Sequence, residues 1–581
     1  MTVRRPLRVL RITTPRCSRV FGVGACESVA DHHCYNTDPT CTFIPGLDLT
    51  ETIEHYYVEN RAWPWIDVPD AFQPSLAIPA LGDVEVAPTI LNISSGDPDV
   101  SPFGARSVAT FRLLDFAYND LTLDPYPETR TGDPYDRGTY WSKWVAIHAF
   151  YEGYEVDYFE GYEGDALDDM LRRTYRVDHF DRARGMVRLT AKDPLSDLNS
   201  DDITMPRVSP GELAEAMGAS VDTLKTIGAT EDDYPESGLI RIGNELMRYT
   251  GRSHDGSNLN ITGLSRGVLE STAAAHAQFE RVQLCIEYEN EPFQNILYDA
   301  LVEYGGVDPA IINKDQWDSL ASRHRAVFLF TGTLTEAIPV ARVAAEISQD
   351  SLSHFWWDER NRIIPLDLLQ PLREITLWTD ETVILEDTFL YTERRDERVT
   401  NVKLLYGLRN VQDSVTDDKS YARIAEFADI DRARQYGGVR TKVLRSRWVQ
   451  SEAVANAICA TFLRRFRNPR QTVTLNIDAK DIAQWTGDLV LLDHFLLSGA
   501  EGTPLIDDWV ITSAQPLQAG ITYRMTMERA GLLGSFWEWV DGSEVSATWD
   551  DATTQERETV GYWLNDDGTD AGGTPRSFRW L

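Results

Sequence analysis

Four cysteines lie close together near the amino end, Cys17, Cys26, Cys34 and Cys41, with 8, 7 and 6 residues between neighbours. Four thiols this close can enclose one metal centre or form two disulfides, and either arrangement fixes the course of the loops between them. No other feature constrains the fold as strongly, because either arrangement would join parts of the chain that lie up to 25 residues apart.

The spacing alone leaves three interpretations open. A structural zinc site normally contains a C-x₂₋₄-C pair, which this stretch lacks. An iron–sulfur cluster takes four thiolates and tolerates longer spacing. Two disulfides would need an oxidising compartment. His32 and His33 precede Cys34 and offer substitutes for a thiolate, although neighbouring residues rarely both bind one ion, and a surface loop is the simpler place for them.

The amino-terminal sequence bears on the compartment in which these thiols fold. Arg4 and Arg5 resemble the basic start of a secretory signal, but the apolar run of about seven residues that such a signal needs does not follow. No stretch approaches the ~20 apolar residues of a membrane helix. We therefore expect folding in a reducing cytoplasm, with thiols or metal ligands rather than disulfides. Cys285 and Cys459 lie in apolar runs and are expected to be buried.

The charge balance excludes one class of function. The chain has 91 acidic and 56 basic residues, a formal net charge of −35, whereas proteins that bind duplex DNA contact phosphates with an excess of Lys and Arg. An acidic wall repels phosphate within a Debye length, so the charge suits a channel through which DNA passes without binding. A general acidic bias that favours solubility is the simpler explanation.

Patterns of hydrophobicity predict a β-rich α+β chain of several domains, since strand-like alternation occupies two long regions and helical periodicity lies between them. We expect a cysteine segment, a first β-rich domain, an inserted module, a mixed helical domain, a second β-rich domain and a carboxyl-terminal extension. Their predicted bounds are residues 1–45, 46–205, 206–285, 286–370, 371–528 and 529–581.

Helices are predicted at five places. Ser209 suits an N-cap and Pro210 the first helical position, which indicates a helix that runs to about Leu224. A short helix is expected over residues 165–174. Apolar side chains at i, i+3 and i+4 spacing, or an apolar run, predict helices at 292–304, 338–351 and 451–466.

The inserted module contains two residues that merit a test for catalysis. A β-hairpin is expected over residues 238–264, with Arg266 at a following corner, placed to anchor a carboxylate or a carbonyl. Glu245 and His276 would have to meet in a pocket to act as a catalytic pair. A role in a turn or an interface is the ordinary explanation for both.

The cysteine stretch resembles a known family. Cys17-Ser-Arg-Val-Phe-Gly-Val-Gly-Ala-Cys26 and Cys34-Tyr-Asn-Thr-Asp-Pro-Thr-Cys41 are similar to the cysteine motif of tail-tip (baseplate hub) proteins from siphophages and gene transfer agents. The hairpin over 238–249 and the following Gly263-Leu-Ser-Arg-Gly267 also look like this family. The resemblance covers most of residues 1–525, whereas residues 529–581 match nothing we can name.

This resemblance implies a structural hub rather than an enzyme. Cys17, Cys26, Cys34 and Cys41 would hold a [4Fe–4S] cluster as a structural staple, with zinc as the alternative metal. Each chain would contribute two tail-tube-like β-barrel domains to a homotrimer at the tail tip of the virion, assembled in the host cytoplasm. Its partners would be the distal tail protein, the tape-measure protein and a central fibre or receptor-binding protein, with DNA passing through the lumen.

Two other functions are weighed against the hub. A tail-associated cell-wall hydrolase or carbohydrate-binding protein is one, but no H-E-x-x-H zinc helix is present. An iron–sulfur redox enzyme is the other, and no second cofactor motif supports it. The tryptophans of the carboxyl-terminal extension suit stacking on sugars or, more commonly, docking on a partner; they are Trp537, Trp539, Trp549, Trp563 and Trp580.

Overall fold

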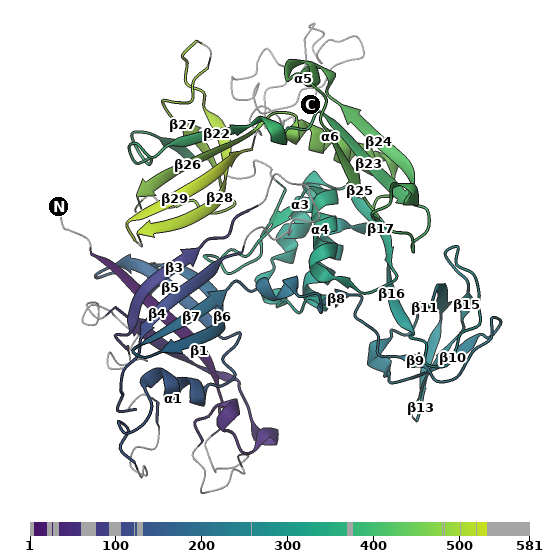
Figure 1. Ribbon diagram of the computed structural model, residues 1–581, viewed down its shortest axis with the longest axis horizontal. Coiled ribbons are helices and arrows are strands. Elements are labelled where there is room, and N and C mark those ends of the chain that lie inside the picture. The colour runs from purple at the N-terminus through teal and green to yellow at the C-terminus, as the bar shows by residue number, and fades with distance from the viewer. Residues whose placement is uncertain are drawn as a thin grey trace, which may run out of the picture.

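Several β-sheets with few helices make up the molecule (Figure 1). The computed structural model describes residues 5–19, 26, 34–59, 77–91, 106–120, 123–124, 132–256, 258–368, 376–478, 480, 483–499, 501–518 and 520–530. Within these ranges, none of the helices has both the length and the apolar content needed to cross a membrane.

The first large sheet has seven antiparallel strands in the order β2-β1-β5-β6-β7-β4-β3. An isolated bridge from Tyr57 to Ile78 brings the edge strand β2 to the chain just before β3. β1 therefore lies inside this sheet, although it belongs to the segment predicted for the cysteines. The strands are β1 (Pro6–Arg16), β2 (Glu51–Val58), β3 (Leu81–Ala87), β4 (Val108–Leu114), β5 (Glu155–Tyr162), β6 (Leu171–Ala183) and β7 (Met186–Lys192).

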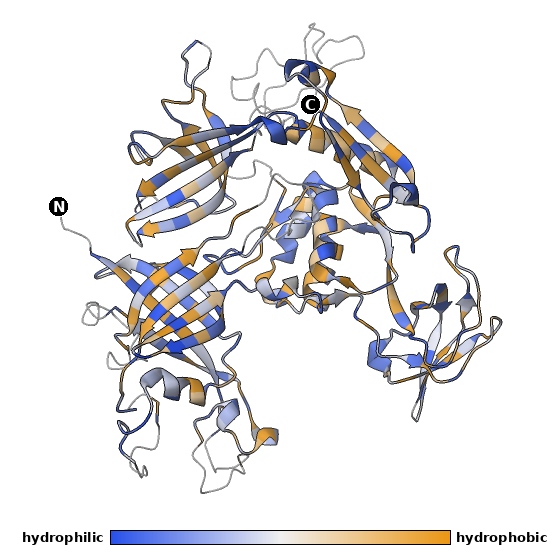
Figure 2. Ribbon diagram, viewed as in Figure 1, coloured by the Kyte–Doolittle hydropathy of each residue, from blue (hydrophilic) through white to orange (hydrophobic). Residues whose placement is uncertain are grey.

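Apolar and polar residues alternate along the strands of this sheet, so that one face of each strand is apolar. Figure 2 shows this alternation as orange and blue along the strands. The helix predicted over residues 165–174 is wrong. Only a 3₁₀ turn, Leu167–Asp169, is present, and the chain then enters β6, whose apolar Tyr175 and Val177 are buried as strands β5 and β7 pair on either side.

Helix α1 (Tyr140–Ile147) packs against this sheet and was not predicted. Thr139 caps it by accepting a hydrogen bond from the Ser142 N–H. Trp141 and Trp144 are fully buried, and Trp141 Nε1 donates to the Leu114 carbonyl at 3.1 Å. The helix thus closes one side of the core through aromatic side chains.

The inserted module projects from the rest of the molecule (Figure 1), which it also contacts where Gln412 Nε2 donates to the Asn244 carbonyl at 3.2 Å. Its hairpin of β11 and β12 confirms the strand prediction, but the helix predicted from Ser209 to Leu224 is wrong, because that stretch supplies strands that bury Leu213 and Leu224. Its strands are β9 (Glu212–Leu213), β10 (Thr223–Ile227), β11 (Gly238–Ile242), β12 (Glu245–Tyr249), β13 (Gly251–Asp255), β14 (Asn258–Thr262) and β15 (Ser265–Arg266).

The two ends of the module lie side by side. Gln283 Nε2 donates to the Arg207 carbonyl at 2.9 Å, and the Ser209 N–H donates to Gln283 Oε1 at 3.2 Å. The chain therefore enters and leaves the module at one place, where β16 returns it to the body of the molecule.

Helices form the centre of the molecule, and the predictions over 292–304 and 338–351 are confirmed. The helices are α2 (Phe293–Asp299), which continues as a π-helical turn over Ala300–Tyr304, α3 (Lys314–His324) and α4 (Val340–Ser351). The accompanying strands are β8 (Thr204–Met205), β16 (Gln283–Pro292), β17 (Leu329–Leu334), β18 (Ile338–Pro339), β19 (His354–Phe355) and β20 (Leu366–Asp367).

A three-stranded sheet in the order β24-β23-β25 shares the core of these helices, through side chains such as Val402, Leu404 and Leu444. The helix predicted over residues 451–466 is confirmed as α6, which packs on β23 and β24 and buries Cys459. The elements are β23 (Asn401–Leu408), β24 (Tyr421–Ala428), β25 (Thr441–Arg445), α5 (Ile430–Gln435) and α6 (Glu452–Phe466).

The second large sheet has six strands in the order β21-β27-β28-β29-β26-β22 and is antiparallel except between β21 and β27. Buried Trp378 and Trp509 lie in its core. The strands are β21 (Thr376–Thr379), β22 (Leu390–Arg394), β26 (Arg470–Asp478), β27 (Leu489–Asp493), β28 (Asp507–Gln518) and β29 (Thr522–Arg529).

The two large sheets contact each other directly (Figure 1). Arg173 on β6 is 1% exposed, forms an ion pair with Glu160 at 3.5 Å, and lies over the Trp485 ring at 5.0 Å. The Tyr523 hydroxyl donates to the same Glu160, and the Tyr162 hydroxyl donates to the Gly520 carbonyl at 2.7 Å. A buried charge therefore joins the two sheets.

Candidate functional sites: a cysteine cluster and a buried carboxylate

The cysteine segment is attached to the first large sheet. Cys17 directly follows β1, and its N–H donates to the Asn36 carbonyl at 2.7 Å. Thr37 Oγ1 donates to the Ile147 carbonyl at the end of α1 at 2.7 Å, and Ser18 Oγ donates to Asp48 Oδ2 at 2.9 Å. These bonds hold the loop that carries Cys34 against the sheet and α1.

None of the four cysteines is in a disulfide. Cys17 and Cys34 are buried, whereas Cys26 and Cys41 are half-buried. The Asn36 N–H donates to Cys34 Sγ at 3.3 Å, a type of bond that stabilises thiolates at metal centres. Asn36 has a φ of +59°, so this turn around Cys34 takes a left-handed conformation that Asn tolerates.

The thiols lie close enough to influence one another electrostatically. Burial raises the pKa of Cys34, the Asn36 N–H acts in the opposite direction, and the nearby thiols of Cys41, Cys26 and Cys17 raise the pKa further. The thiols of Cys17, Cys26 and Cys41 are therefore near enough to Cys34 to affect its pKa. His32 and His33 lie outside the described residues.

As the side chains stand, no group of three or more His, Cys, Asp or Glu among the described residues is arranged to hold a metal ion. A cluster between the four thiols thus requires the side chains to turn toward a common centre. The donor set fits such a centre by its chemistry, because four cysteines that are free of disulfides are the ligands that an iron–sulfur cluster takes.

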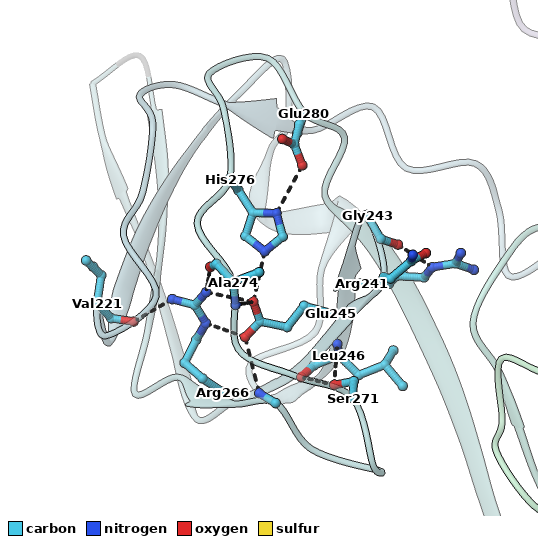
Figure 3. A network of polar contacts seen from close by, with 12 residues as sticks. Val221, Arg241, Gly243, Glu245, Leu246, Arg266, Ser271, Ala274, His276 and Glu280 are labelled. Carbon is cyan, nitrogen blue, oxygen red and sulfur yellow. Dashed lines mark hydrogen bonds and ion pairs between the residues drawn. The ribbon is translucent and has the colours of Figure 1, made fainter.

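The second candidate is a network around Glu245 in the inserted module (Figure 3). The Glu245 side chain is fully buried and accepts two hydrogen bonds from Arg266, at 2.6 and 2.7 Å. The Gly267 N–H donates to it at 3.2 Å and the Ala274 N–H at 2.9 Å, while His276 Nε2 lies 2.9 Å from Oε2. Both carboxylate oxygens are therefore fully engaged.

The partners of Glu245 are themselves held in place. Arg266 also donates to the carbonyls of Val221 at 3.2 Å and Ala274 at 2.6 Å, which confirms its predicted role as an anchor. His276 is 6% exposed, and its Nδ1 lies 3.0 Å from Glu280 Oε2. Glu245 and His276 do meet, but in a filled interior where every acceptor is engaged. This arrangement joins β12, β15 and the loop to β16, and it presents no open site for a substrate.

Acidification should weaken the module through Glu245. Burial acts to raise the pKa of Glu245, but hydrogen bonds from Arg266, the Ala274 N–H and His276 lower it to about 2, against an ordinary 4.5. The folded state thus favours the carboxylate, so its stabilisation, roughly 3 kcal/mol, is complete above about pH 4.5 and is lost as pH falls toward 2. Urea unfolding at about pH 6 and about pH 3 should show a difference between wild type and Glu245→Gln that shrinks at the lower pH; a constant difference would contradict this.

The structure also locates the other residues for which the sequence made a prediction. Cys285 on β16 and Cys459 on α6 are buried as predicted, and burial raises their pKa values to about 12 and about 11. Within the charged residues 393–398, which the structure places partly at the surface, Arg395 forms an ion pair with Glu393 at 2.8 Å. The carboxyl-terminal tryptophans lie outside the described residues.

No family model matches the sequence, and no curated protein matches it either. Among solved structures, the chain is similar to a tail protein from Neisseria meningitidis MC58, with 9% identity over 77% of this chain and 92% of that one and a TM-score of 0.36. The 43 kDa tail protein of prophage MuSo2 from Shewanella oneidensis gives 9% identity, 78% and 98% coverage, and a TM-score of 0.36. A chain of a native gene transfer agent virion gives 13% identity, 55% and 82% coverage, and a TM-score of 0.30. TM-scores of this size establish neither a shared fold nor a shared function.

Proposed function

We propose that the chain is a structural hub subunit at the tip of a phage-type tail, with a [4Fe–4S] cluster on Cys17, Cys26, Cys34 and Cys41. The observation that carries the proposal is the cysteine motif, in which the segment Cys34-Tyr-Asn-Thr-Asp-Pro-Thr-Cys41 resembles the family. The loop that carries Cys34 is bonded to Cys17 beside the first large sheet, which supports the proposal. When bound, the cluster would link the loops between the four cysteines and stabilise them.

The arrangement of the two large sheets fits this role. They contact each other through Arg173, Glu160 and Tyr523, so one chain presents two sheet domains as a connected pair. If each domain serves as a tail-tube-like barrel, a homotrimer supplies six such units, the number that a hexameric tube above it requires. The bridge from Tyr57 to Ile78 supports a closed form for the first.

The partners and the location follow from the same proposal. The hub would lie between the tail tube and a central fibre or receptor-binding protein, next to the distal tail and tape-measure proteins, and DNA would pass through its lumen during ejection. The formal net charge of −35 supports a wall that does not bind phosphate. Zinc remains the alternative metal for the four thiolates.

Two measurements test the proposal. Protein purified without oxygen should be brown and contain iron and acid-labile sulfide. Colourless protein with bound zinc would show that the four cysteines hold zinc instead of a cluster. Protein with neither metal would contradict a metal centre. Cryo-electron microscopy of tails should show three copies around the axis with compact density at the cysteines. A chain found alone in solution, absent from tails, would overturn the hub.

A further inference from the structure

An apolar band lies exposed on the hairpin that joins β27 to β28. It consists of Phe495 and Leu496 on one arm and of Leu505 and Ile506 on the other. Phe495 is 86% exposed and Leu496 61%, while Leu505 and Ile506 are 42% and 44% exposed. Large apolar side chains that gather on one exposed segment mark a surface to which another segment or a partner binds.

Hydrogen bonds hold the two arms of this hairpin in place. The Leu505 N–H donates to the Leu497 carbonyl at 3.1 Å, and the Phe495 N–H donates to Asp380 Oδ2 at 3.0 Å. Leu497 is buried in the core of the second large sheet. The apolar band is therefore a fixed surface, and an occupant does not have to order it on binding.

The described chain ends next to this band. In the antiparallel pairing of β28 with β29, Arg529 lies opposite Trp509. The next residue, Ala530, continues the pairing, because its N–H donates to the Asp508 carbonyl at 3.0 Å. The residues after Ala530 lie outside the described part of the chain, so the last described bond is two residues from Ile506.

The register of this pairing indicates where the following residues would meet the hairpin. Continued without a shift, it places Leu532 opposite Ile506 and Leu533 opposite Leu505. Successive residues of a strand turn their backbone groups to opposite sides. Since the Leu505 N–H points to Leu497 on the side of β27, the backbone groups of Ile506 point to the side of β29.

The sequence after Ala530 suits an apolar surface. Residues 531–540 read Gly-Leu-Leu-Gly-Ser-Phe-Trp-Glu-Trp-Val, with one charged residue among ten. Two leucines come first, where the register meets Leu505 and Ile506, and three aromatic residues follow. The composition of this segment therefore matches the band that it would reach.

Two other occupants fit less well. A lipid surface would have to admit the polar end of the hairpin, where Ser498, Glu501 and Thr503 are exposed beyond the apolar band, and a charged side chain is costly in lipid. A second copy of the chain would bring another net charge of −35 against the first, which opposes self-association.

We propose that residues 531–539 bind the apolar band of the β27–β28 hairpin in the same chain. The segment extends β29, with Leu532 paired to Ile506, and lays the aromatic side chains that follow over the rest of the band. This contact fixes the start of the carboxyl-terminal extension to the second large sheet. The proposal does not depend on the hub function or on the cysteine motif.

Disulfide trapping in the full chain tests the register. Residues paired across antiparallel strands have Cα atoms about 5.5 Å apart, a distance that suits a disulfide. We expect Ile506→Cys/Leu532→Cys to cross-link within one molecule under oxidised glutathione, at least about fivefold faster than Ile506→Cys/Leu533→Cys, whose second thiol lies on the opposite face. Digestion and mass spectrometry identify the linked peptides, so that the six native cysteines do not confuse the result.

Hydrogen exchange provides a second test without added cysteines. Leu532→Pro removes a backbone donor and should accelerate exchange of the Ile506 amide at least about tenfold, whereas Leu564→Pro, in the same extension, should change it less than about twofold. Equal cross-linking of the two cysteine pairs, linkage mainly between two molecules, or unchanged exchange in Leu532→Pro would overturn the proposal.

Discussion

Replacing Glu245 by alanine should destabilise the inserted module by about 3–5 kcal/mol, the usual cost of removing one partner of a buried ion pair. The Arg266 guanidinium would remain at 9% exposure without its carboxylate, and His276 would lose the acceptor at 2.9 Å. The N–H groups of Gly267 and Ala274 would also lose their acceptor. Hydrogen exchange of the amides in β10, β12 and β14 should therefore accelerate.

The control for this variant is Glu280→Ala. Glu280 contacts the same histidine, at 3.0 Å, but is 38% exposed, so its loss should cost less than about 1 kcal/mol. Urea unfolding of both variants at neutral pH measures the difference. Comparable stability of the two variants would show that Glu245 is not the centre of the network.

Replacing Cys34 by serine should abolish the metal centre, if the proposed cluster is present. A serine hydroxyl is a poor substitute for a thiolate, and Cys34 accepts the Asn36 N–H that orients the turn. We expect iron content and visible absorption to fall to near background. Tail assembly should also fail, because the loop next to β1 and α1 would lose its link to Cys17.

Cys285→Ser provides the matched control, since Cys285 is also buried but lies on β16, away from the cysteine segment. It should retain the iron and the absorption of the wild type. Infectious particles with normal iron from Cys34→Ser, or loss of iron in both variants alike, would contradict a structural centre at the four cysteines.

Hydrophobic periodicity in the sequence correctly predicted those helices whose apolar residues recur at helical spacing. The helices over 292–304, 338–351 and 451–466 formed because an apolar stripe faces a shared core. Ser209 shows the limit of such reasoning. It looked like an N-cap, but its Oγ accepts the Leu284 N–H at 2.9 Å, a contact with a strand 75 residues away. Burial of Leu213 and Leu224 in a sheet outweighed the local helix signal.

The candidate sites also differ in how far the sequence alone could predict them. The four cysteines lie within 25 residues, so their motif was visible in the sequence. The Glu245 network was only half visible, because Arg266 could be recognised as an anchor but the burial of Glu245 depends on the pairing of β11, β12 and β15. The pocket that Arg342 on α4 and Arg445 on β25 both line could not be predicted, since these two elements come together only through tertiary packing.

The adjoining ends of the inserted module have a consequence for engineering and for evolution. Because Arg207 and Gln283 touch, the intervening residues form a closed excursion from the chain. Excision with a short bridging turn, or exchange for another cassette, would leave the path of the flanking backbone unchanged, but β16 would lose β11 as its strand partner. The molecule thus has a natural grafting point between β8 and β16.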